Sequence, residues 1–220
     1  MPELTPEFLV TAFITYMVFL FSTTCHEAAH AWVAQRGGDS TAALGGQVSL
    51  NPLPHIRRSP YGMVIFPLLS YFLFHGSMIG FASAPFDPLW ERRHPKRSAW
   101  MALAGPAANF SLMLLAAVAL RAGRAMDLFH RQPNGTAGFL LTTLFTMFML
   151  NLLLGTFNLL PLPPLDGSTA IMLFMSETTA QKYLDWLRGN TFGFAGLLIG
   201  LYVFGKIFPF IQEFVLHLFF

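Results

Sequence analysis

The stretch His26-Glu27-Ala28-Ala29-His30 follows directly on an apolar run, Phe8 to Cys25, that contains no charged residue. On a helix, residues four apart lie about 40° apart around the axis and one turn along it, so both imidazoles can bind one metal ion. Glu27 lies on the adjoining face, where its carboxylate can take a proton from a water on that ion. The pattern is typical of zinc hydrolases, in which the ion activates water and the glutamate is the general base. The alternative is a pair of helix histidines that hydrogen-bond polar partners in a protein core.

Composition indicates that this helix lies in a membrane. Of the 220 residues, 54% are hydrophobic and only 11% are charged, whereas about a quarter of the residues in soluble domains are charged. We therefore expect an all-α polytopic membrane protein that lies in the lipid bilayer. The length suits one domain, residues 1–220, and a net charge of +2 gives no support to nucleic-acid binding. A carboxylate and two imidazoles facing lipid would cost several kcal/mol, a cost that a bound metal ion would offset.

The apolar runs predict about five to six membrane segments. The first helix is expected to begin at Pro6, a residue suited to a first helical turn, and to end at Gly37-Gly38. The histidine pair would then lie about 10 Å before that end, inside a hydrocarbon layer about 30 Å thick. The later expected segments are spans at about 61–83 and 98–120, a long run at 135–165, an interfacial amphipathic helix at 176–188 and a last span at 192–220.

Two segments are expected to be irregular. Residues 44–52 contain a short alternating run, Gln47 to Leu50, which predicts an interfacial β-like segment that is either a surface loop or an edge strand pairing with an extended substrate. Residues 158–167 contain three prolines in four positions, which break the helix and predict an extended, re-entrant segment. Extended backbone at membrane depth is tolerated where it lines a polar site.

A catalytic zinc usually has three protein ligands and an open position. The first helix supplies two, and Asp166 is the strongest candidate for the third, because a carboxylate framed by prolines in an apolar segment otherwise lacks a partner. Asp166 could instead, or in addition, cap a short helix at 168–175. The other candidates are the remaining histidines: His55, His75, His94, His130 and His217.

Taken together, the motifs resemble the site-2 protease family of intramembrane zinc metalloproteases, in its compact bacterial and archaeal form without a peptide-binding domain. The segments that carry the resemblance are His26-Glu27-x-x-His30, Leu44-Gly45-Gly46-Gln47-Val48-Ser49-Leu50-Asn51-Pro52-Leu53, Pro85-Phe86-Asp87-Pro88, Ala104-Gly105-Pro106-Ala107-Ala108-Asn109 and Asn158-x-x-Pro161-x-Pro163-x-x-Asp166-Gly167. The likeness covers about residues 10–175, and the C-terminal amphipathic helix and last span, 176–220, follow this core.

The resemblance implies one zinc ion per chain held by His26, His30 and Asp166, with Glu27 as the base. It also implies that Asn158 lies near the metal, where its amide would hold the substrate carbonyl or the developing oxyanion. Members of the family cut transmembrane segments of other membrane proteins, and a compact member implies a prokaryotic cell (inner) membrane.

The chain departs from the family pattern at two places. Arg57-Arg58 stands where relatives often carry an acid after a histidine, and Ala82-Ser83 stands where relatives often carry Lys-Pro. Both lie outside the zinc motifs and bear on substrate handling. Two other functions use the same kinds of residue: a zinc transporter, whose ligands would be spread along a path, and an inactive scaffold that binds membrane helices, which would not need Glu27.

Overall fold

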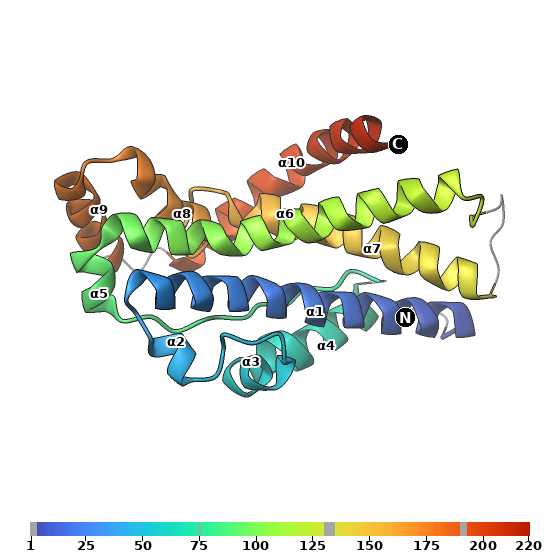
Figure 1. The fold of residues 1–220 in the computed structure, drawn as a ribbon, viewed down its shortest axis with the longest axis horizontal. Coiled ribbons are helices and arrows are strands. Elements are labelled where there is room, and N and C mark those ends of the chain that lie inside the picture. The colour runs from blue at the N-terminus through green and yellow to red at the C-terminus, as the bar shows by residue number, and fades with distance from the viewer. Residues whose placement is uncertain (1–3, 75, 130–134, 190–192) are drawn as a thin grey trace.

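A computed structural model describes residues 4–74, 76–129, 135–189 and 193–220. Every regular element within these residues is a helix, as expected for an all-α protein. Four of the helices are long and apolar enough to cross a membrane (Figure 1). They are α1 (Pro6–Gly37), α6 (Pro95–Ala125), α7 (Gly135–Asn158) and α10 (Gly193–Phe219).

Helix α1 begins and ends at the residues that the sequence predicts. The Thr5 hydroxyl accepts a hydrogen bond from the Phe8 amide at 3.2 Å, and Pro6 occupies the first turn, where its missing N–H costs nothing. At the other end Gly38 adopts φ +100°, a left-handed conformation that favours glycine. At 1.5 Å per residue the 32-residue helix is about 48 Å long. The helix therefore exceeds the thickness of a bilayer core.

The segment expected to be a second span at 61–83 is shorter and partly extended. It forms a π-helix, Tyr61–Ile65, and α4 (Phe66–Leu73), after which residues 77–87 run extended to α5 (Pro88–Arg93). Gly76 turns the chain at φ +97°, and the Ser70 hydroxyl holds the extended chain by binding both backbone groups of Ile79. The expected count of five to six membrane segments is therefore not confirmed, because this apolar helix is too short to cross.

Residues 44–52 form no strand. Helix α2 (Thr41–Leu44) is followed by turns and bends, and α3 (Pro52–Arg58) begins at once. The backbone amides of Gly46 and Gln47 donate back to the carbonyls of Ala43 and Ala42, at 2.9 and 3.0 Å. Because local turns use these donors, they are not available for a ladder with a second strand.

The predicted break in the long apolar run is present. Helix α7 ends at Asn158, and the Pro-rich segment that follows forms turns and bends rather than the expected extended chain. Helix α8 (Asp166–Ala170) and a 3₁₀ helix, Ile171–Phe174, then resume the chain before α9 (Glu177–Gly189). Lys96 Nζ, at the start of α6, donates to the carbonyl oxygens of Met172 and Leu173 at 2.9 and 2.8 Å, and to that of Met175. One ammonium group thus ties the turn after α8 to α6.

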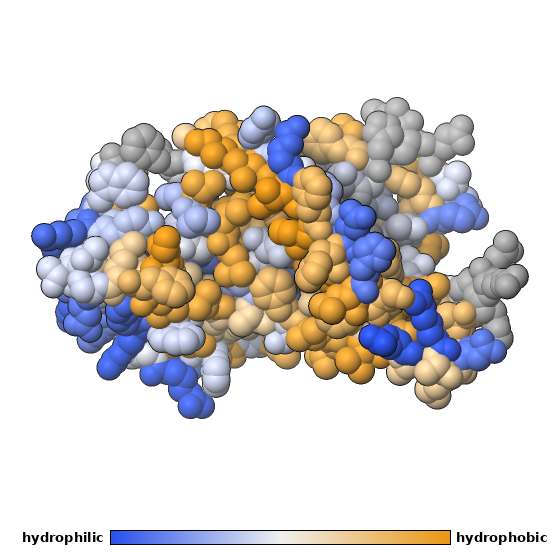
Figure 2. Space-filling view, turned by 90° about the horizontal axis from the view of Figure 1, so that it is seen from above, coloured by the Kyte–Doolittle hydropathy of each residue, from blue (hydrophilic) through white to orange (hydrophobic). Residues whose placement is uncertain are grey.

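Helices α1, α6 and α7 lie side by side and hold the core (Figure 1). On the α6–α7 side, small residues Ala116 and Ala117 of α6 receive Phe148 and Leu152 of α7, which are fully buried. Lipid is as apolar as these side chains, so this close packing and interhelical hydrogen bonds hold the helices together. Figure 2 shows apolar side chains over the middle of the molecule, hydrophilic ones at the end formed by α5 and α9, and further hydrophilic groups toward the opposite end.

Candidate metal centre

Three side chains that are far apart in the sequence meet at one point. His26 and His30 project from α1, and Asp166 is the first residue of α8, directly after the Pro-rich break. The two Nε2 atoms are 2.9 Å apart, and Asp166 Oδ2 lies 3.1 Å from His26 Nε2 and 3.4 Å from His30 Nε2. Among the described residues this is the one group of three histidines, cysteines or acids whose ligand atoms converge.

The geometry of this cluster fits a tetrahedral metal site. Nitrogen and oxygen ligands at 2.0–2.1 Å from a tetrahedral zinc lie about 3.3 Å from each other, close to the three separations found here. Asp166 Oδ2 is buried and accepts no hydrogen bond of good geometry, although two ring nitrogens lie beside it. A buried carboxylate oxygen without a partner is costly, and a cation would remove that cost.

Gly105 of α6 makes room for the two imidazoles. A Cβ atom at this position would lie 2.4 Å from His30 Nε2 and 2.5 Å from His26 Nε2. The backbone of α6 therefore approaches the ring nitrogens as closely as only glycine allows. Gly105 thus packs directly against the histidine pair.

The far side of each imidazole is also bound. His26 Nδ1 lies 2.6 Å from Asn109 Oδ1, and His30 Nδ1 lies 2.7 Å from the Met101 carbonyl oxygen. Because a carbonyl oxygen only accepts, Nδ1 of each ring donates its proton, and the lone pair on Nε2 points toward Asp166. Both rings are thus held in the tautomer that binds a metal through Nε2.

Glu27 lines a cavity of about 310 Å³ together with His30 and Asp166. Glu27 is only 6% exposed, and it borders the same cavity as the candidate ligands His30 and Asp166. Glu91 lines the cavity as well, held by the Ser98 hydroxyl at 3.2 Å and by an ion pair with Arg188 of α9. The sequence did not single out Glu91, because it lies in a basic loop and its partner is distant in the chain.

The extended chain between α4 and α5 forms one wall of this cavity, through Ala82 to Ala84 and Phe86. Gln47 Nε2 donates to the Ser83 carbonyl oxygen at 3.1 Å and fixes the wall from behind. His55 supports Gln47, with its Nδ1 3.5 Å from Gln47 Nε2 and its Nε2 donating to the Ser49 carbonyl oxygen at 3.0 Å. The segment expected to be either a surface loop or a substrate-pairing edge strand thus supports the wall of the cavity.

The remaining candidates lie elsewhere. Asn158 ends α7, and its side-chain amide donates to the Leu154 carbonyl oxygen at 3.1 Å; it does not line the cavity. Of the alternative third ligands, His55 is engaged as described above, and His217 lies exposed in α10 beside Glu213. His94 precedes α6, and His75 and His130 lie outside the described residues.

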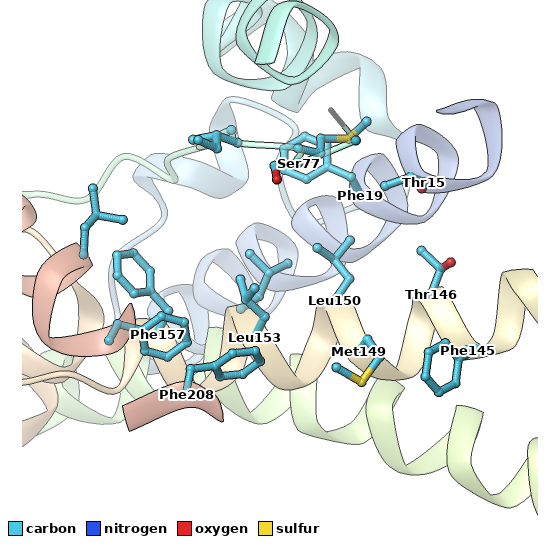
Figure 3. Close-up of a pocket in the computed structure, with 17 residues that line it drawn as sticks. Thr15, Phe19, Ser77, Phe145, Thr146, Met149, Leu150, Leu153, Phe157 and Phe208 are labelled. Carbon is cyan, nitrogen blue, oxygen red and sulfur yellow. The ribbon is translucent and has the colours of Figure 1, made fainter. Parts of the chain in front are cut away.

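A second, larger cavity of about 560 Å³ lies between α1, α7, α10 and residues 76–80 (Figure 3). Figure 3 shows Phe19 of α1 and Leu150, Leu153 and Phe157 of α7 around it. No acid, base or histidine lines this cavity among the described residues. Its polar groups are the hydroxyls of Thr15, Ser77 and Thr146 and backbone atoms.

Comparison with known proteins finds similarity to zinc metalloproteases. The profile of peptidase family M50 matches residues 122–200, which include Asn158 and Asp166. Two bacterial relatives carry the name "Putative zinc metalloprotease". YwhC of Bacillus subtilis (strain 168) is 28% identical over 187 residues, which are 83% of this chain and 77% of YwhC. Rip2 of Mycobacterium tuberculosis (strain H37Rv) is 31% identical over 153 residues, 70% of this chain and 54% of Rip2. No solved structure matches the chain.

Proposed function

Because the chain belongs to peptidase family M50, the site-2 protease family, and is a membrane metalloprotease, we propose that it hydrolyses peptide bonds within or near transmembrane segments of other membrane proteins. One observation carries the proposal. Two oriented imidazoles and a buried carboxylate with an unpartnered oxygen converge beside Glu27, in a cavity that can admit water. The bacterial relatives support a prokaryotic cell membrane as its location.

One zinc ion per chain would be held by His26 Nε2, His30 Nε2 and Asp166 Oδ2. When bound, zinc supplies Lewis acidity that makes water a better nucleophile near neutral pH. Glu27 would take a proton from the attacking water as the water oxygen bonds to the substrate carbonyl carbon, and would give that proton to the peptide nitrogen as the C–N bond breaks. The Nδ1 contacts of the two histidines keep both rings in place throughout. Asn158 would stabilise the substrate carbonyl only if its amide turned away from Leu154.

The substrate is expected to be extended or locally unwound, because a helical peptide bond is shielded by its own hydrogen bonds. The extended chain at residues 76–87 supports this proposal: residues 76–80 line the large apolar cavity, and Ala82 to Ala84 line the site cavity. A membrane segment entering the apolar cavity would meet extended backbone that leads to the site, and could pair with it as an added strand. The departure of Ala82-Ser83 from the family pattern therefore falls on the proposed substrate path.

Convergence of the polar groups also argues against a zinc transporter. A transport path needs ligands at successive depths, whereas the cluster found in the described residues is a single one, with a candidate base beside it. An inactive scaffold would not require Glu27 in that position.

The test is Glu27→Gln, measured on one detergent-purified sample for zinc content and for cleavage of a membrane substrate. We expect cleavage to fall by about 10² to 10⁴, because proton transfer is lost, while zinc stays near one per chain. Glu177→Gln, a change at an exposed acid in the first turn of α9, is the matched control and should cut normally. Candidate substrates are the membrane proteins that stay uncut in cells carrying Glu27→Gln. Undiminished cleavage by the purified variant would refute the assignment of Glu27 as the base.

A further inference from the structure

Three polar residues at the centre of the helix bundle are fully buried: Ser22 of α1, Asn109 of α6 and Asn151 of α7, each 0% exposed. They form a continuous line that ends on the metal centre. Asn109 Nδ2 donates to Asn151 Oδ1 at 2.8 Å, and Asn109 Oδ1 lies 2.6 Å from His26 Nδ1. Asn151 Nδ2 donates to the Ser22 hydroxyl and to the Met147 carbonyl oxygen, both at 2.8 Å.

The Met147 carbonyl, at the end of the line away from His26, determines which atom donates in each hydrogen bond of the line. The two ends of an amide side chain differ only in which atom donates, so its orientation follows from its partners. The Met147 carbonyl can only accept, so Asn151 must present its NH₂ group there and its oxygen to Asn109. Asn109 must then present its NH₂ group to Asn151 and its oxygen to His26. His26 Nδ1 is consequently obliged to carry a proton.

This direction matters because only one tautomer of His26 can bind a metal through Nε2. With the proton on Nδ1, Nε2 holds a lone pair directed at the site. If Asn109 were reversed, its NH₂ group would face Nδ1, and the proton would move to Nε2 and block coordination. His30 does not share this dependence, because its Nδ1 faces a backbone carbonyl, that of Met101, which cannot rotate.

We propose that Asn109 and Asn151 are positioning residues that fix His26 in its metal-binding tautomer, with the Met147 carbonyl of α7 as the reference that sets their direction. The proposal rests on the proposed zinc site and adds to it residues that touch no ligand atom of the metal. The competing role is helix packing alone, since interhelical hydrogen bonds between buried amides also hold membrane helices together.

The experiment measures zinc affinity by competition with a chelator, together with the visible spectrum of the cobalt-substituted protein and the melting temperature of the metal-free protein. Asn109→Leu and Asn151→Leu should each weaken zinc binding by about 10- to 100-fold, the range for partners of metal-bound histidines, and should alter the cobalt spectrum. Asn109→Asp loses the donor to Asn151 but keeps an oxygen facing His26, and should therefore bind zinc more tightly than Asn109→Leu. Ser22→Ala leaves the Met147 contact in place and should not change the affinity.

Thr156→Val is the matched control. It removes a hydroxyl from α7 that donates to the Leu152 carbonyl oxygen at 2.6 Å and has no link to His26. Native zinc affinity in both leucine variants, with lowered melting temperatures, would overturn the proposal and leave only a packing role. If a leucine variant does not fold, Asn109→Ala and Asn151→Ala decide in the same way. If the native protein itself did not bind zinc, the proposed function would be refuted instead. The two failures are therefore distinguishable.

Discussion

The apolar cavity and the site cavity differ in both size and chemistry. The larger, about 560 Å³, is lined almost wholly by apolar side chains, whereas the smaller, about 310 Å³, contains Glu27, His30, Glu91 and Asp166. Both are bordered by α1 and by the extended chain at residues 76–87. Phe19 and Glu27 are eight residues apart on α1, or about 12 Å along its axis. In a membrane protein a large apolar cavity can hold an apolar substrate segment or a lipid chain. Buried ionisable residues indicate which cavity holds the chemistry.

The largest effect is expected from the site cavity, on replacing Asp166 by alanine. Asp166→Ala removes the third candidate ligand and should lower zinc affinity by more than about 100-fold, beyond the loss caused by outer-shell partners, and abolish cleavage. Asp166→His should recover part of the metal. Asp185→Ala, at an exposed acid paired with Arg92 at 3.1 Å, serves as the control. Zinc bound as tightly by the alanine variant as by the native chain would exclude Asp166 as a ligand. The alternative role of helix cap is not found, because Leu165 is the N-cap of α8 and no side-chain capping hydrogen bond forms there.

An intermediate effect is expected from filling the apolar cavity. Thr146→Phe places a ring in the space shown in Figure 3 and should slow cleavage of a transmembrane substrate by about tenfold, as obstruction of an apolar pocket typically does. Zinc content and cleavage of a short soluble peptide should stay native, because neither needs this cavity. The control is Leu115→Phe, because Leu115 lies on α6 and is 67% exposed. An equal fall in the cleavage rates of both substrates would show that the apolar cavity is not the route by which a transmembrane substrate enters.

The smallest effect is expected from the extended chain where it forms the wall of the site cavity. Gln47→Leu removes the donor that holds the Ser83 carbonyl oxygen, and one such hydrogen bond contributes about 0.5–1.5 kcal/mol. We expect KM for a membrane substrate to rise by about two- to tenfold with zinc content unchanged. Gln181→Leu, which removes a longer contact to the Arg92 carbonyl oxygen at the surface, should leave KM as it was. A fall in kcat with KM constant would contradict the proposal that Gln47 helps bind substrate by holding the cavity wall at Ser83.

The sequence predicted the parts of the site whose chemistry is local or unusual. Spacing on one helix placed His26, Glu27 and His30 on adjoining faces, and a carboxylate after three prolines drew attention to Asp166. The break after Asn158 was predicted because proline cannot continue a helix. These inferences needed no knowledge of how the helices pack.

What the sequence did not predict depends on contacts between distant segments. The apolar run at 61–83 has the composition of a span, but the Ser70 hydroxyl and the turn at Gly76 end the helix and hold the chain extended. The roles of Asn109 and Glu91 follow from partners on other helices. Asn151 did leave a signal, since it is a lone amide within a leucine-rich run, where a polar side chain is costly unless it is paired.

The ligands of the proposed site are separated by most of the chain, and this has a consequence for biogenesis. Helix α1 is synthesised first and carries two imidazoles and a carboxylate that have no third ligand beside them. Asp166 emerges only after α6, which supplies the hydrogen-bond partners of His26 and His30, and after α7, whose Asn151 binds Asn109. We expect a newly made chain to acquire its metal late, once α8 has packed against α6 and brought Asp166 to the histidines of α1. The protease would thus be inert during its own insertion.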